Sequence, residues 1–108
     1  MKPTGHVVML VTASGRDEAE KIAAALLDGR QAACVNIVPS VISRFWWKGR
    51  IDSAEEALLL IKTRQTAVAD VITTVQRNHS YSVPEIIVLP IIGGSGEYLN
   101  WIAGEVPE

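Results

Sequence analysis

Residues 45–50 read FWWKGR, a stretch in which three large aromatic side chains stand directly before a Lys-Gly pair. Lys48-Gly49 suits a tight two-residue hairpin turn, although the pair is a weaker signal than Asn-Gly. Turns are normally polar and exposed to solvent. The three rings therefore need a protein surface to pack against, either in the same chain or in another one.

Two long extended arms flank this turn, at residues 31–47 and 50–63. Pro39 interrupts the first arm, which predicts an edge strand or a β-bulge at that point. An arm of 17 residues reaches roughly 55 Å when extended. A globule of 108 residues is only roughly 35 Å across. We therefore expect the hairpin to project from the body unless it bends sharply.

The rest of the chain alternates strand and helix patterns. The expected elements are a strand at 6–12, helices at 16–28 and 64–78, a strand at 85–91 and a short helix at 97–105. Ser14 with Asp17 resembles a capping box, and Thr63 and Ser95 are the expected caps of the later helices. This order predicts one α+β domain over residues 1–108 with the ferredoxin-like βαββαβ plan, a long central hairpin and a short C-terminal helix.

Composition and charge exclude several classes of function. Ten Lys and Arg are scattered among twelve Asp and Glu, so no basic stripe predicts nucleic-acid binding. No apolar run is long enough to span a bilayer, and the single Cys34 cannot form an internal disulfide. We expect a cytoplasmic protein with no membrane partner. No catalytic signature is present, and Glu55-Glu56 is interpreted as a solvated bulge rather than an acid/base pair, so no enzyme activity is predicted.

The hairpin predicts self-association. A two-stranded ribbon is marginally stable alone and exposes edges that pair with other chains. In the predicted fold, right-handed crossovers place both long helices on one face of the sheet, which leaves the other face bare. Other copies of the chain could cover these surfaces in a closed ring, with Phe45, Trp46 and Trp47 at the contacts. In the alternative, the ribbon bends and the rings pack on their own subunit.

Four stretches carry a resemblance to a known family: AACVNIVPSVISRFWWKGRI (32–51), LLLIKT (58–63), NHSYSVPEIIVLPI (78–91) and YLNW (98–101). In order and spacing they closely resemble CutA, the divalent-cation tolerance family. The resemblance implies a ferredoxin-like homotrimer whose long hairpins pack between subunits, with a role in tolerance of copper and other divalent ions. The trimer is also similar to the PII-type signalling proteins. That similarity implies a signalling or adaptor role or, alternatively, a sensor that binds a small molecule between subunits.

Two candidate metal ligands are present, His79 and Cys34, and Cu²⁺ or another divalent cation is the candidate cofactor. In some family members copper binding is attributed to a Cys in the first strand and a His pair before the 79–85 loop. Those positions here hold Val11 and Asn78-His79, and the loop also departs from the family pattern at Ser80 and Ser82. For both candidates we favour a structural role, His79 at a helix C-terminus and Cys34 as a small buried side chain.

A second candidate site combines polar and aromatic residues. Lys62 ends one predicted strand and Glu85 begins another, and we expect these ends to approach each other. With Tyr81 and Trp101 they would form a polar cleft with an aromatic wall, suited to a small anionic or zwitterionic ligand. Asn36, on the same face of its strand as Cys34, would be a further polar contact. The alternative is a structural ion pair with aromatic packing around it.

Overall fold

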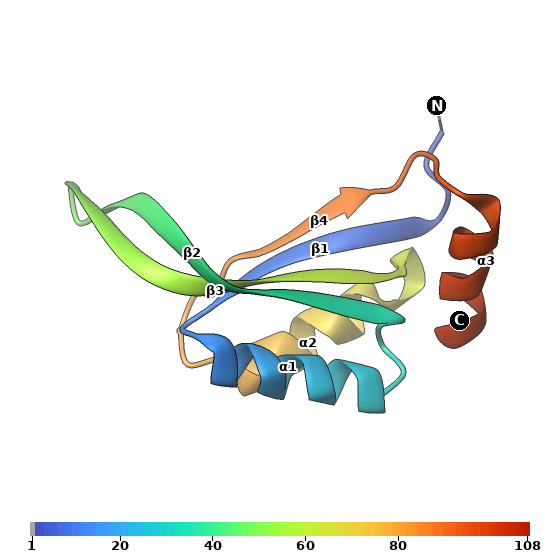
Figure 1. Cartoon of the computed structure of the whole chain (residues 1–108), viewed down its shortest axis with the longest axis horizontal. Coiled ribbons are helices and arrows are strands. Elements are labelled where there is room, and N and C mark those ends of the chain that lie inside the picture. Colours follow the sequence, from blue (N-terminus) through green and yellow to red (C-terminus); the bar gives the residue numbers. More distant parts are fainter. Residues whose placement is uncertain (1) are drawn as a thin grey trace.

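A computed structural model describes residues 2–108 as one four-stranded sheet with three helices (Figure 1). The strands are β1 (His6–Ala13), β2 (Cys34–Trp47), β3 (Arg50–Arg64) and β4 (Ile86–Pro90). The helices are α1 (Arg16–Asp28), α2 (Val68–Asn78) and α3 (Gly96–Glu105), and a short 3-10 turn, η1 (Gln65–Ala67), precedes α2. The strand order is β2-β3-β1-β4, and every neighbouring pair is antiparallel. The predicted ferredoxin-like order is therefore confirmed.

Alternation along the two central strands builds the core. Val7, Met9 and Val11 of β1 point to the same face of the sheet as Leu59 and Ile61 of β3, and all five are buried. Helices α1 and α2 cover this face (Figure 1). Their apolar stripes supply buried residues that include Ile22, Leu26, Val71 and Val75. Each fully buried aliphatic side chain contributes roughly 1.5 to 3 kcal/mol to folding. No helix among residues 2–108 is long and apolar enough to cross a membrane.

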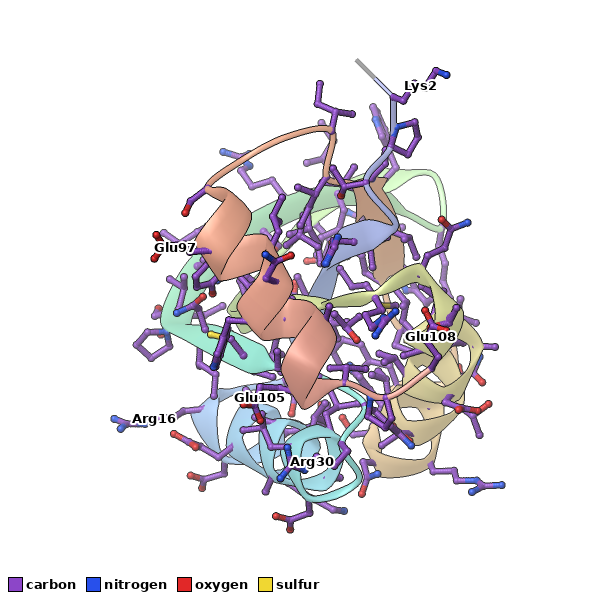
Figure 2. All side chains as sticks on the ribbon, turned by 90° about the vertical axis from the view of Figure 1, so that its right-hand side faces the viewer. Lys2, Arg16, Arg30, Glu97, Glu105 and Glu108 are labelled. Atoms are coloured by element: carbon purple, nitrogen blue, oxygen red, sulfur yellow. The ribbon has the colours of Figure 1, made fainter. Side chains whose placement is uncertain are left out.

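The opposite face of the sheet carries no long helix (Figure 1). Ile87 and Leu89 of β4 and Val38 of β2 are exposed there, beside half-buried Leu10 and Leu60 of the central strands. We call this side of the sheet the uncovered face. Helix α3 lies at the end of the sheet remote from the hairpin tip (Figure 1). An ion pair between Arg30 and Glu105, 2.8 Å long, fixes the C-terminal end of α3. Both residues are labelled in Figure 2.

The hairpin has the predicted turn and the predicted bulge. Lys48 (φ 50°) and Gly49 (φ 76°) both adopt positive φ angles, as a two-residue turn of type I′ requires. The register between β2 and β3 shifts between Val38 and Val41, on either side of Pro39. The molecule measures 43 × 31 × 22 Å, and the tip of the hairpin projects beyond α1 and α2 (Figure 1). The expected projection is therefore confirmed.

Two of the predicted helix caps are wrong. Helix α1 begins after Gly15 with no side-chain cap, and the Glu18 carboxylate accepts a hydrogen bond from the Ser14 N–H at 3.0 Å. Thr63 lies inside β3 because this strand stays paired with β1 as far as Arg64. Its hydroxyl donates to the Gln31 carbonyl at 2.6 Å instead of capping a helix. The predicted Ser95 cap of α3 is confirmed.

Candidate functional site

The structure separates the residues of the predicted ligand cleft into two groups. Lys62 of β3 and Leu89 of β4 lie on either side of Val8 in β1. Glu85 precedes Ile86, which lies opposite Val11. Measured along β1, which lies between them, Lys62 and Glu85 are thus at least three residues apart. At 3.3 Å per residue this separation is roughly 10 Å. The expectation that Lys62 and Glu85 approach each other is wrong, because the strand register sends them to different levels of the sheet.

Lys62 belongs to a group near α3 that also contains Cys34, Asn36, Tyr98 and Trp101. The Asn36 carbonyl oxygen accepts hydrogen bonds from the Lys62 ammonium and, at 3.8 Å, from the Cys34 thiol. Tyr98 stacks on Trp101 with 5.4 Å between ring centroids. Burial raises the pKa of Tyr98, and the neighbouring Cys34 raises it further. Asn36 and Lys62 are therefore in contact with each other and with Cys34, and Trp101 is connected to this group through Tyr98.

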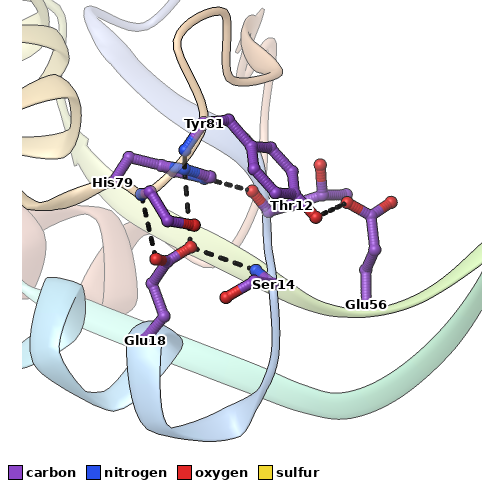
Figure 3. A network of polar contacts seen from close by, with 7 residues as sticks. Thr12, Ser14, Glu18, Glu56, His79 and Tyr81 are labelled. Carbon is purple, nitrogen blue, oxygen red and sulfur yellow. Dashed lines mark hydrogen bonds and ion pairs between the residues drawn. The ribbon is translucent and has the colours of Figure 1, made fainter.

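The other group surrounds the loop after α2 (Figure 3). The His79 side chain is fully buried, and its Nε2–H donates to the Thr12 carbonyl at 2.7 Å. A carbonyl can only accept, so Nε2 carries the proton. Nδ1 then accepts the N–H of Tyr81 at 3.1 Å, and Glu18 Oε1 lies 3.4 Å from the same nitrogen. Both ring nitrogens are therefore occupied by atoms of this chain.

These contacts bear on the prediction that His79 and Cys34 are metal ligands. His79 has no free lone pair directed to solvent, and Cys34 lies in the other group of residues. Within residues 2–108, no three His, Cys, Asp or Glu side chains gather as a metal site would require. His79 is the residue at the C-terminal end of α2, as expected of a helix-terminal histidine, and its ring makes a further contact with β1. The ring fastens the 79–85 loop to β1.

Glu18 holds the loop from the side of α1. Its carboxylate accepts the N–H of Ser14 at 3.0 Å and the N–H of Ser80 at 2.9 Å. Burial raises the pKa of Glu18, but the hydrogen bonds from Ser14 and Ser80 outweigh the burial, so the pKa lies below its ordinary value of 4.5. The carboxylate form is thus favoured by the fold.

Glu56 was misjudged from the sequence as part of a solvated bulge. Its side chain points to the same side of β3 as Leu58 and Leu60, and the residue is only 8% exposed. The Tyr81 hydroxyl donates to Glu56 Oε2 at 2.9 Å. Burial, and then the Glu56 carboxylate, raise the pKa of Tyr81 to about 12, so the phenol keeps its proton at neutral pH. The alternation of side chains along a strand was the signal that could have found Glu56.

The loop and the outer half of the hairpin line an open cleft of about 850 Å³. The hairpin side supplies Ser43, Arg44, Phe45, Trp47, Asp52, Ala54 and Glu56, and the other side supplies Thr12, Tyr81, Ser82, Val83 and Glu85. Tyr81 and Glu85 are thus the two predicted cleft residues that line it. This volume is within the range of sites that bind small molecules, about 300 to 1,000 Å³.

Fold and sequence together match one family. The family model described as CutA1 divalent ion tolerance protein matches residues 7–105, which include all three helices and all four strands except the first residue of β1, His6. The chain belongs to the CutA1 family. The predicted family is therefore confirmed.

Members of the CutA1 family from distant organisms are similar to this chain. The chloroplastic CutA of Arabidopsis thaliana is 44% identical over 101 residues, which are 94% of this chain and 56% of the plant protein. The chain thus spans little more than half the length of that relative. The solved periplasmic divalent cation tolerance protein CutA of Archaeoglobus fulgidus is 42% identical with a TM-score of 0.91, and the match covers 94% of this chain and 99% of that one. CutA1 from Shewanella sp. SIB1 is 37% identical with a TM-score of 0.94, and the match covers both chains completely.

Proposed function

We propose that the protein is a non-enzymatic homotrimer that takes part in divalent metal tolerance, chiefly of copper, as a signalling or adaptor trimer. One observation carries the proposal of self-association. Ile42, Trp46 and Ile51 share one face of the hairpin and are 80%, 73% and 59% exposed. We call these three side chains the hairpin patch.

Soluble proteins rarely leave an apolar surface such as the hairpin patch exposed, and another chain often covers it. Trp46 and Ile51 are direct cross-strand partners, so their side chains form one continuous apolar area near the tip. Contiguous exposed apolar surface of this kind marks interaction sites. Phe45 and Trp47 point to the other face of the hairpin, into the cleft described above. Among the three predicted aromatic contacts, Trp46 is therefore the one we expect to contribute most to assembly.

The sheet supports assembly in a ring. Its two edge strands, β2 and β4, remain unpaired on their outer sides, and the uncovered face is apolar. A hairpin of one copy laid along β4 of the next satisfies the edge and covers the patch. A head-to-tail contact of this type closes into a ring when the rotation permits. Three copies is the number that the family resemblance implies.

The metal-tolerance role is supported by membership of the CutA1 family. Residues 2–108 of one chain hold no ready group of metal ligands. We therefore propose that copper is coordinated by side chains from more than one copy of the chain, at a subunit contact. We propose a cytoplasmic location, whereas the named relatives include a chloroplastic and a periplasmic protein.

Sedimentation velocity at micromolar concentration tests the assembly. The wild-type chain should sediment as a trimer, and Trp46→Ser should shift the population to smaller species. Leu27→Ser is the matched control, because Leu27 is also an exposed apolar residue but lies on α1, away from the sheet edges. A monomeric wild-type protein contradicts the proposal, and so does a Trp46→Ser trimer as stable as the wild type.

The cleft favours a second candidate, a small-molecule sensor similar to the PII proteins. Its volume suits a small ligand, and Tyr81 and Glu85 line it. Calorimetric titration with Cu²⁺ and with a panel of metabolites separates the two candidates. Stoichiometric copper binding supports direct action on the metal. A metabolite that binds when copper does not favours the sensor, and a panel without any binder counts against it.

A further inference from the structure

The cleft between the hairpin and the 79–85 loop has an acidic lining. Asp52, Glu56 and Glu85 supply three carboxylates, whereas the strand register points the side chain of Arg44, which also lines the cleft, to the face of the hairpin that carries Trp46. Lys62, which the sequence suggested as the partner of Glu85, is engaged with Asn36 instead. The electrostatic field in the cleft therefore favours a positively charged occupant over an anion.

Glu56 makes this preference specific. The residue is more than nine-tenths buried, and one of its carboxylate oxygens accepts a hydrogen bond from the Tyr81 hydroxyl. Within residues 2–108 the other oxygen accepts no hydrogen bond and Glu56 enters no ion pair. Glu56 is also not among the residues with a fully shielded, unpartnered polar atom, so this oxygen can be reached from the cleft. One oxygen of Glu56 thus remains available to a cation that enters the cleft.

The walls of the cleft suit a cation with an organic body. Phe45, Trp47 and Tyr81 supply three aromatic rings. The faces of such rings attract ammonium groups, and the Lys48 ammonium already lies 5.9 Å from the centre of the Trp47 ring. A bare metal ion would leave most of the 850 Å³ empty, and the three carboxylates do not gather around one point as metal ligands do.

We propose that this cleft binds a small organic ammonium ion. The ammonium group pairs with Glu56, and the apolar part of the ligand packs against Phe45 and Trp47. The hairpin patch and the cleft are on opposite faces of the hairpin, because Phe45 and Trp47 point away from Trp46, so a chain that covers the hairpin patch does not by that contact fill the cleft. The inference rests on the sensor function proposed above and names the class of ligand for it.

Isothermal titration with three molecules of one shape tests the proposal. The probes are 2-phenylethylamine, which is protonated at pH 7, the neutral 2-phenylethanol and the anionic phenylacetate. The amine should bind the wild-type protein at least about tenfold more tightly than either of the others, a difference of about 1.4 kcal/mol. Equal affinity for amine and alcohol overturns the proposal.

Two carboxylates adjacent in sequence provide the matched variants. Glu56→Gln keeps the shape of the side chain and should weaken binding of the amine at least about tenfold. Glu55→Gln removes the same charge from the opposite face of β3, where Glu55 is exposed and bonded to Ser40, and should bind like the wild type. Equal losses in both variants overturn the proposal. If Glu56→Gln does not fold, judged by circular dichroism, Trp47→Leu provides the second test and should weaken binding several-fold.

The outcomes separate this inference from the function on which it rests. Tighter binding of phenylacetate than of the amine overturns the ammonium proposal and leaves the sensor function standing. A metabolite of the panel that binds in the cleft while the amine does not has the same meaning. Absence of binding by the amine and by the whole panel overturns both.

Discussion

Single residues fasten the 79–85 loop to the rest of the molecule. His79 bonds it to β1, Glu18 bonds it to α1 and Tyr81 bonds it to β3 (Figure 3). The loop has no regular secondary structure, so these side chains replace the backbone ladder that would otherwise hold it. The shape of the cleft therefore depends on a few polar contacts, each of which can be removed alone.

Removal of the Tyr81 hydroxyl should destabilise the protein. Tyr81→Phe leaves the buried Glu56 carboxylate without its donor, which should cost about 1 to 3 kcal/mol of unfolding free energy. Urea denaturation measures the loss. The same substitution in a Glu56→Gln background should cost less, because no buried charge remains. Equal costs in the two backgrounds contradict the assignment of the effect to Glu56.

Glu18 should make stability depend on acid pH. Its pKa in the folded protein lies below the ordinary value of 4.5, so the folded state binds its proton less readily than the unfolded state. The resulting stabilisation is complete above about pH 4.5 and is lost as the pH falls through the lower folded value. The urea midpoint should fall between about pH 5 and pH 3 more steeply in the wild type than in Glu18→Gln. Glu20→Gln, on the exposed side of α1, should follow the wild type.

At the scale of elements, the hairpin turn is the feature most dependent on one backbone conformation. Gly49 has a φ of 76°, and a Cβ atom added there meets nothing within 4 Å. Gly104 of α3 is equally open but has a helical backbone. The same substitution at these two positions therefore isolates the backbone effect.

Gly49→Ala and Gly104→Ala should change stability in opposite directions. The first places a side chain at positive φ and should destabilise the protein by about 1 kcal/mol. The second replaces a flexible residue within a helix and should stabilise by roughly 0.5 to 1 kcal/mol. Thermal unfolding of both variants checks the signs. A Gly49→Ala variant at least as stable as the wild type contradicts the type I′ turn.

At the scale of the whole molecule, assembly and stability should be linked. If the folded trimer proposed above forms, the thermal midpoint of the wild type should rise by a few degrees between about 1 and 100 µM protein, because the unfolded chain does not associate. Trp46→Ser should reduce this dependence on protein concentration, since it removes the exposed aromatic ring of the hairpin patch. A wild-type midpoint independent of concentration contradicts the link between folding and association.

Local patterns determined the order and type of the elements. The 3.6-residue period of α1, the β-rich arms and the Lys48-Gly49 turn each depend on neighbours in the chain, and the structure confirms them. The same holds for the Pro39 bulge and the Ser95 cap. The family could also be identified from the sequence, because the matching stretches keep their residues and spacing over nearly the whole chain.

Only the tertiary structure decided which polar side chains meet. The register of β2 with β3 places Lys62 beside Cys34 and Asn36, and the register of β1 with its two neighbours leaves Glu85 at another level. The path of the 79–85 loop buries His79 between Thr12 and Glu18, residues more than 60 positions earlier in the chain. Helical and strand periods state which way a side chain points relative to its neighbours. They do not state which distant residue stands opposite, because that depends on how the sheet and the loop close in space.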